Sequence, residues 1–182
     1  MKPGDGDDMS DKSHLKRGLA LPHVILPATT GAAICLAVAP GLHVLIVYPW
    51  TGRPGPPNPP HWDDIPGAHG STPELEGFRD LAPEFARRNI NLFGLSRQTS
   101  DYQREMTTRL NIPFPILSDT EGRMSSALAL PSFTTGGEKY LKRLTLVVSA
   151  GTIEAVRYPV ADPASHASEV LGWLEHEAAA GT

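Results

Sequence analysis

Runs of apolar residues along the chain predict a set of buried strands. Leu42 to Tyr48 is almost continuously aliphatic and β-branched, and Ile90 to Ser96 forms a second such segment. A run without polar alternation is typical of a strand that is covered on both faces of a sheet. The shorter apolar run from Ile34 to Val38 predicts a short strand or extended segment that leads into the first of these strands.

Between and after these strands, apolar residues recur with helical spacing. One helix is predicted from Ser71 to about Arg88, and Pro83 predicts a kink or a break within it. A second helix is predicted from Asp101 to Leu110, with Asp101 or Ser100 as its N-cap. The order strand, helix, strand, helix is typical of an α/β protein.

The C-terminal half adds further elements to this pattern. Its predicted elements are an extended piece at 112–117, a short helix at 121–128, a hairpin-like pair of strands at 143–148 and 152–158, and a closing helix at 163–177. Together these elements predict an α/β sandwich of thioredoxin-like type, in which helices flank a central mixed β-sheet. We place this single domain at residues 16–178.

Two segments differ from this pattern in composition. Residues 1–15 are acidic and lack the layout of a secretory signal, so we expect a disordered leader there. Residues 50–70 are rich in proline, which removes backbone donors and prevents a helix. This Pro-rich insertion contains Trp50 and Trp62, and loops of such length are more often functional than not.

Charge and cysteine content narrow the class of protein. The 182 residues carry a formal net charge of −4, without the run of Lys or Arg that a nucleic-acid site requires. The apolar stretch at 31–47 is interrupted by Pro40-Gly41, so we expect no membrane span. The single cysteine, Cys35, rules out an intramolecular disulfide, and we expect a cytoplasmic monomer or homodimer.

Several segments, taken in order and spacing, resemble the peroxiredoxins of the AhpC/TSA type, and in particular their bacterioferritin-comigratory branch. The matching segments are 19–22, 44–49, 71–73 with 77–80, 114–119, and 142–148 before Gly151. They span most of the chain from about residue 16 to 175. The resemblance implies a thioredoxin-like fold and a peroxidatic site at the start of the helix that begins near Ser71.

The resemblance also implies roles for individual residues. In the family motif the first position is the peroxidatic cysteine and a second cysteine follows five residues later; here these positions are Ser71 and Glu76. Thr72 matches the threonine that follows the first cysteine. The family arginine that faces the reactive sulfur maps onto Arg143, and the family threonine maps onto Thr51.

Replacing sulfur by oxygen removes the peroxidase chemistry. A cysteine thiol has a pKa near 8.5, which a helix N-terminus and an arginine lower, and its thiolate attacks a peroxide to form a sulfenic acid. A serine hydroxyl is hardly ionised at neutral pH without an adjacent base. We therefore expect no thiol peroxidase activity at Ser71, and we expect no cofactor.

Ser71 itself supports three interpretations. It could form a capping box with Glu74, which is a purely structural role. It could belong to a retained pocket in which helix N–H groups, Ser71, Thr72 and Arg143 bind a small polar or anionic ligand. It could also act as a nucleophile with His69 as its base.

The remaining candidate residues lie mostly in the Pro-rich insertion. Possible contacts to a small-molecule substrate are Trp50, Thr51, Trp62, His69, Pro73 and Phe133. The three aromatic residues could instead pin the loop to the core. The polar residues His61, Asp63, Asp64 and His69 suit a divalent ion, but a flexible polar loop explains them as well, and we predict no metal site. Cys35 is expected to be a small buried hydrophobic residue.

Three hypotheses about function follow. The first is a peroxiredoxin-like protein that has lost thiol peroxidase activity and uses its former peroxidatic pocket for small-molecule binding or a non-redox reaction. The second is a thiol peroxidase in the form of a Cys-to-Ser variant at position 71. The third is a protein-interaction module that presents the Pro-rich loop to a partner.

Overall fold

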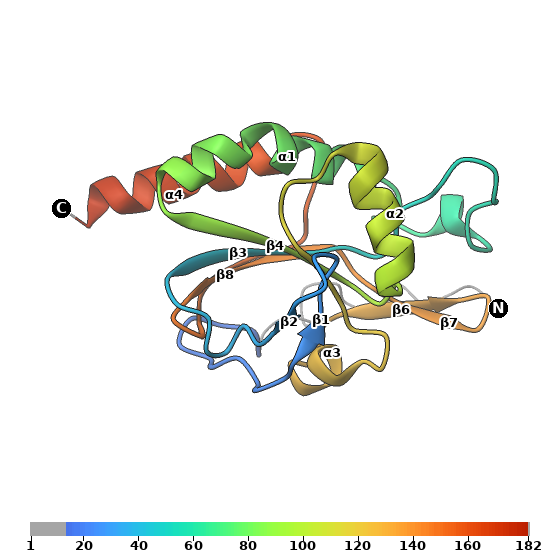
Figure 1. Ribbon diagram of the computed structural model, residues 1–182, viewed down its shortest axis with the longest axis horizontal. Coiled ribbons are helices and arrows are strands. Elements are labelled where there is room, and N and C mark those ends of the chain that lie inside the picture. Colours follow the sequence, from blue (N-terminus) through green and yellow to red (C-terminus); the bar gives the residue numbers. More distant parts are fainter. Residues whose placement is uncertain (1–13, 182) are drawn as a thin grey trace.

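The computed structural model describes residues 14–181, so the predicted leader lies almost entirely outside the described residues. A five-stranded sheet with strand order β5-β4-β3-β8-β9 lies between two layers of helices and loops (Figure 1). The elements are β1 (Leu26–Pro27), β2 (Ala33–Ile34), β3 (Leu42–Val47), η1 (Trp62–Asp64), α1 (Ser71–Arg87), β4 (Ile90–Ser96), α2 (Ser100–Leu110), β5 (Ile116–Ser118), α3 (Arg123–Ala127), β6 (Ser132–Thr135), β7 (Glu138–Leu141), β8 (Leu144–Ser149), β9 (Thr152–Arg157) and α4 (His166–Ala180).

The central strand β3 explains why the sheet is mixed. It pairs in parallel with β4 and antiparallel with β8, so Val47 lies opposite both Leu95 and Leu144. Alternate residues of β3 point to opposite faces: Val44 enters one core and Leu45 the other. Its continuous apolar run therefore reflects burial on both sides, and the predicted thioredoxin-like α/β class is confirmed.

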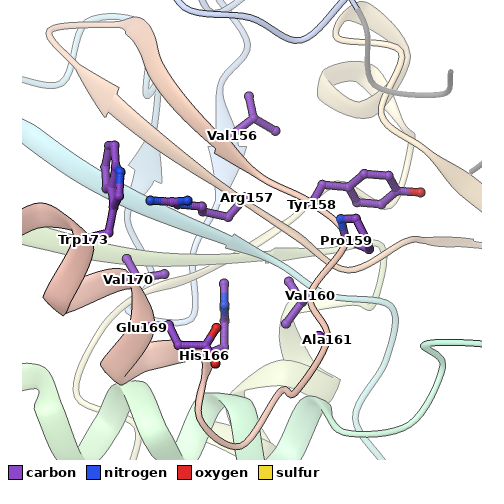
Figure 2. Close-up of a pocket in the computed structure, with 10 residues that line it drawn as sticks. All are labelled: Val156, Arg157, Tyr158, Pro159, Val160, Ala161, His166, Glu169, Val170 and Trp173. Carbon is purple, nitrogen blue, oxygen red and sulfur yellow. The ribbon is translucent and has the colours of Figure 1, made fainter. Parts of the chain in front are cut away.

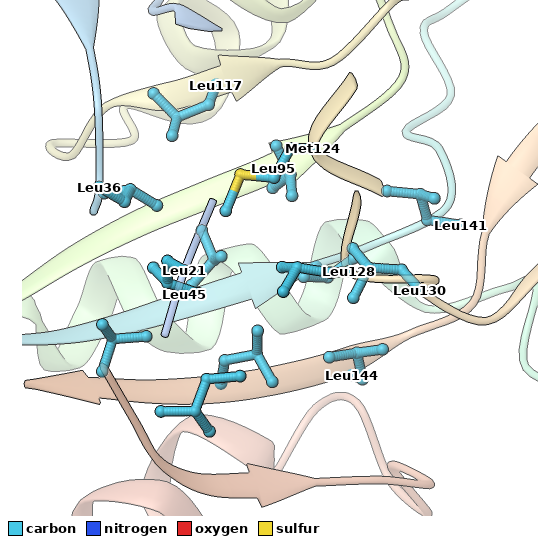
Figure 3. Packing of buried hydrophobic residues seen from close by; sticks show 14 of the residues in the cluster. Leu21, Leu36, Leu45, Leu95, Leu117, Met124, Leu128, Leu130, Leu141 and Leu144 are labelled. Carbon is cyan, nitrogen blue, oxygen red and sulfur yellow. The ribbon is translucent and has the colours of Figure 1, made fainter. Parts of the chain in front are cut away.

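Two hydrophobic cores cover the two faces of the sheet. On one face, α1, α2 and α4 contribute side chains such as Phe78, Met106 and Val170. On the other face, α3 and the N-terminal segments contribute side chains that include Leu21 and Met124 (Figure 3). The packing of α1 on this face places its first turn next to the end of β3, where the candidate site lies.

Two details of the predicted elements were wrong. The segment from Ile34 to Val38 is not a strand beyond Ile34, because the chain turns there: the Val38 amide donates to the Cys35 carbonyl at 3.3 Å, and Val38 is 65% exposed. Helix α1 does not break at Pro83 but runs through it. Phe78 and Phe85, on either side of the proline, are fully buried and hold both halves of the helix on the sheet.

The helix caps and one hairpin also differ from expectation. The N-cap of α2 is Thr99, whose hydroxyl accepts a hydrogen bond from the Tyr102 amide at 3.3 Å. The β6–β7 hairpin was not predicted, although its turn residues Gly136 and Gly137 have positive φ angles and are typical of a two-residue hairpin turn. Within the described part of the chain, no helix is both long enough and apolar enough to cross a membrane.

Candidate functional site

The candidate site lies at the edge of the sheet formed by strand ends: the carboxyl ends of the parallel strands β3 and β4, where helices α1 and α2 begin. Because β8 runs antiparallel to β3, Arg143, just before β8, reaches this same edge. Ligands of open α/β sheets bind outside the carboxyl ends of the parallel strands. The topology therefore brings Ser71, Gln98 and Arg143 to the position where a binding site is expected.

Arg143 connects the start of α1 to the Pro-rich loop. Its Nη2 donates to Ser71 Oγ at 3.1 Å and to the carbonyl oxygens of Gly67 at 3.3 Å and His69 at 3.0 Å. Arg143 is only 4% exposed and Ser71 only 3%. The two residues that the resemblance pairs across 72 positions of sequence are thus in direct contact, within a closed cluster.

Glu74 is the partner of Arg143 that sequence reasoning missed. The capping-box interpretation was wrong: the N-cap of α1 is Gly70, with φ 107°, and no side chain caps this helix. Glu74 is completely buried, and Arg143 Nη1 donates to its Oε2 at 3.0 Å. Glu74 lies about one helical turn after Ser71. Its carboxylate faces the interior, where it meets Arg143, the residue just before β8.

The Glu74–Arg143 pair is incompletely satisfied. Glu74 Oε1 and Arg143 Nε are buried and have no hydrogen-bond partner within residues 14–181. Burial raises the pKa of Glu74 to about 7, although the charge and hydrogen bond of Arg143 oppose this shift. Buried polar atoms without partners cost free energy, so this cluster is retained at some cost to stability.

A second polar network lies beside the first, between β4 and α2. The Tyr48 hydroxyl donates to Gln103 Oε1 at 2.5 Å, and burial raises the pKa of Tyr48. Thr51 is buried, and its hydroxyl donates to Gln98 Oε1 at 3.3 Å. Thr51 therefore contacts the end of β4, and its hydroxyl is engaged by Gln98 rather than by Ser71 or Arg143.

The aromatic residues of the Pro-rich loop form one cluster with the β6–β7 hairpin. The ring of Trp62, which is 3% exposed, lies 5.4 Å from Trp50, 5.6 Å from Phe133 and 5.1 Å from Tyr140. Phe133 and Tyr140 are register partners in the hairpin. Trp62 thus pins the loop to the hairpin, and the Gly136-Gly137 turn is the signal that could have revealed Tyr140 as a member.

Trp50 also borders an open cavity, which we call the edge cavity. Its volume is about 240 Å³, and its lining includes Trp50, Arg97, Gln98, Tyr102, Lys139 and Tyr140. Arg53 lies over the outer side of this wall, with its guanidinium carbon 3.9 Å from the centre of the Tyr102 ring. The edge cavity combines an aromatic wall with three charged side chains: Arg97, just before α2, and Glu138 and Lys139 from β7.

The other predicted residues are placed differently. The His69 side chain is 56% exposed, and its Nε2 lies 2.6 Å from Asp63 Oδ1, so it is not positioned as a base for Ser71. Thr72 is half-buried in the first turn of α1, and Pro73 is exposed. Among residues 14–181, no cluster of three or more metal-ligating side chains is found.

Cys35 lies near the opposite edge of the sheet from Ser71. Ala37, two residues after Cys35, packs against Gly151. Gly151 comes just after Ser149, which pairs with Leu42, the first residue of β3. Arg143 and Ser71 lie beyond the last residue of β3. A strand of this length spans about 20 Å, so the Cys35 sulfur does not reach the site.

Comparison with known proteins agrees with this architecture. The AhpC/TSA family matches residues 66–156, which is half of the chain. A Coxiella burnetii protein named as a bcp peroxiredoxin is 28% identical over 116 residues, which cover 62% of this chain and 74% of that protein. Peroxiredoxin bcp1 of Schizosaccharomyces pombe is 29% identical over 66% of this chain, which spans 55% of that relative.

Solved structures share the fold. The crystal structure of peroxidoxin BcpB from Mycobacterium tuberculosis aligns with a TM-score of 0.71 and 25% identity, over 88% of this chain and 97% of that one. A Cys-to-Ser mutant of PrxQ from Xylella fastidiosa aligns with a TM-score of 0.73 and 23% identity, over 90% and 97% of the two chains. By its matched domain and its fold, this chain belongs to the AhpC/TSA family.

Proposed function

We propose that this peroxiredoxin-like chain has no thiol peroxidase activity and that its former peroxidatic pocket serves small-molecule binding or a non-redox reaction. The observation that carries the proposal is the contact between Arg143 Nη2 and Ser71 Oγ, at 3.1 Å. An arginine that would stabilise a thiolate is in place, but the atom that it contacts is a hydroxyl oxygen. Oxygen does not form the sulfenic acid on which the peroxidase cycle depends.

The cost of the buried cluster supports a functional role for this edge of the sheet. Glu74 and Arg143 each leave a buried polar atom without a partner, and each such atom costs about 1–3 kcal/mol. A pair held only for stability would be replaced by apolar residues at little or no cost. The presence of this costly pair beside Ser71 favours a functional site over a purely structural helix start.

The Ser71 cluster is closed, and neither Ser71 nor Arg143 lines the edge cavity. We therefore assign the ligand to the edge cavity, beside the former peroxidatic position. At about 240 Å³ it is smaller than a site for a drug-sized molecule. Trp50, Tyr102 and Tyr140 supply flat apolar walls, while Arg97 and Lys139 supply positive charge. We therefore expect a small planar or anionic molecule, with Trp50 as the side chain that contacts it most closely.

A peroxide assay tests the loss of peroxidase activity. Hydrogen peroxide consumption with a thiol reductant should equal the protein-free background, both for the natural chain and for Cys35→Ala. Turnover that survives Cys35→Ala would overturn the proposal. A cysteine codon at position 71 in the encoding gene would instead favour the second hypothesis, a thiol peroxidase present as a serine variant.

A thermal-shift screen of small metabolites tests the binding site. A compound that stabilises the chain should lose its effect in Trp50→Leu, because this change removes the aromatic wall. Trp173→Leu is the matched control, since Trp173 lines a different cavity. An equal response of both variants to the compound would place its site elsewhere.

A further inference from the structure

A second and larger cavity lies against the N-terminal half of α4. We call it the α4 cavity. Its volume is about 480 Å³, which is within the range of small-molecule sites. The last residues of β9, the connection after it and the first two turns of α4 form its walls (Figure 2). Neither the family motif nor the Ser71 cluster contributes a residue to this lining.

Arg157 gives the α4 cavity a cationic group that is fixed in place. Its guanidinium carbon lies over the Trp173 ring, 4.3 Å from the ring centre, so the indole positions the side chain (Figure 2). Within residues 14–181 it forms no ion pair with a carboxylate. A planar guanidinium presents paired N–H donors that match the two oxygens of a carboxylate.

His166 adds a neutral hydrogen-bonding group to the same wall. It is 3% exposed, and its Nε2 lies 2.8 Å from Thr145 Oγ1, while Nδ1 makes no hydrogen bond to another described residue. Burial lowers the pKa of His166 to about 4; Glu169 opposes this shift, and the positive charges of Arg143 and Arg157 add to it. The imidazole is therefore uncharged at neutral pH and is fixed by Thr145.

The rest of the lining is mostly apolar. Apart from Arg157, His166 and Glu169, the lining residues are apolar or aromatic: Val156, Tyr158, Pro159, Val160, Ala161, Val170 and Trp173. Glu169 stands at the exposed rim, where its Oε1 accepts a hydrogen bond from the Ser165 hydroxyl at 2.7 Å. A ligand that fits this lining has one anionic end and an apolar body.

We propose that the α4 cavity is a binding site for a small organic acid, with the carboxylate on Arg157 and beside His166 and the apolar body against Val160 and Val170. This site is separate from the edge cavity and does not depend on the proposed function. The carboxylate replaces water around a guanidinium that has no acidic partner among the described residues, and the indole of Trp173 keeps that guanidinium oriented. Binding there needs no change in the Ser71 cluster.

Calorimetric titration of the full chain with phenylacetate tests the proposal, and phenylacetamide serves as the uncharged analogue of the same shape. Phenylacetate should bind saturably at millimolar concentration, and the amide should bind about tenfold more weakly or not at all. Arg157→Gln should weaken phenylacetate binding by about tenfold. Arg123→Gln, which removes the same charge from α3 on the opposite face of the sheet, should leave the affinity unchanged.

Three results would overturn the assignment. They are the absence of saturable phenylacetate binding, equal affinity for the acid and the amide, and a loss of binding in Arg97→Gln, a variant of the edge cavity, that Arg157→Gln does not produce. The last result would place the acid in the edge cavity. An NMR titration gives a second readout: bound phenylacetate should raise the pKa of His166, because a nearby anion stabilises the imidazolium, and an unchanged His166 titration would contradict the proposal.

Discussion

Arg143 precedes β8 and Arg157 ends β9, so both lie at the same end of the sheet. Their surroundings differ in burial and in the groups that they contact. Arg143 is buried, and its Nη1 and Nη2 groups donate to Glu74, Ser71 and loop carbonyl oxygens. Arg157 is half-buried, lies on the Trp173 ring and borders an open cavity. An arginine mapped from a family motif can thus be locked in place, while an arginine outside any motif remains available to a ligand.

The difference follows from what each arginine meets on the neighbouring helix. Helix α1 presents a carboxylate, Glu74, to Arg143, whereas α4 presents an aromatic ring, Trp173, to Arg157. A buried carboxylate and guanidinium neutralise each other. An aromatic face attracts a cation but leaves its N–H groups free at the ring's edge.

The largest expected effect is that of Arg143→Met on stability. The change leaves Glu74 buried without its cation and releases the carbonyl oxygens of the Pro-rich loop, at a cost of about 3–5 kcal/mol in the free energy of unfolding. Urea unfolding measures this cost. The double variant Arg143→Met with Glu74→Leu should recover most of the loss, and failure to recover would mean that the loop contacts matter more than the charge.

The pH dependence of stability should separate the two buried titrating groups. The pKa of Glu74 is raised to about 7, so the folded state holds an extra proton between about pH 4.5 and 7, and stability falls as pH rises through that range. The pKa of His166 is lowered to about 4, so the unfolded state holds the extra proton between about pH 4 and 6.5, and stability rises with pH there. In the natural chain these two slopes oppose each other.

Single variants should reveal the two slopes. Glu74→Gln should leave a chain whose stability rises from about pH 4 to 6.5, and His166→Gln should leave one whose stability falls from about pH 4.5 to 7. Each slope is at most about 1.4 kcal/mol per pH unit. Urea midpoints at a series of pH values measure them, and parallel profiles for the three proteins would contradict the account.

The smallest expected effect is that of Arg157→Gln on stability. The change removes a cation–π contact with Trp173, which contributes about 0.5–1 kcal/mol, and leaves no buried charge behind. The urea midpoint should therefore fall far less than in Arg143→Met. A loss as large as that of Arg143→Met would show that Arg157 is structural and would remove the contrast.

The sequence predicted best the strands whose side chains are buried on both faces of the sheet. Strand β4 matches its predicted bounds, Ile90–Ser96, and β3 falls within its predicted range, because burial on both faces leaves a long apolar run. Residues 34–38 have the same apolar character but form a turn, so a short run alone does not distinguish the two. The β6–β7 hairpin was missed because its strands are half-exposed and mostly polar.

The site was predictable in part. Resemblance paired Ser71 with Arg143, and the structure places them in contact. The role of Glu74 was not predictable, because its partner lies 69 positions away and an early helix carboxylate is usually a cap. Resemblance also suggested Thr51 for this site, but its hydroxyl donates to Gln98, which lies in the connection between β4 and α2.

The absence of sulfur at position 71 is what removes peroxide reactivity from this chain, and Ser71→Cys restores that sulfur. In a Cys35→Ala background without reductant, the Ser71→Cys thiolate should attack one peroxide oxygen, releasing hydroxide and leaving a sulfenic acid, so each chain consumes one equivalent of hydrogen peroxide. Cys35→Ala alone should consume none. An inert Ser71→Cys chain, or peroxide consumption by Cys35→Ala alone, would contradict the account.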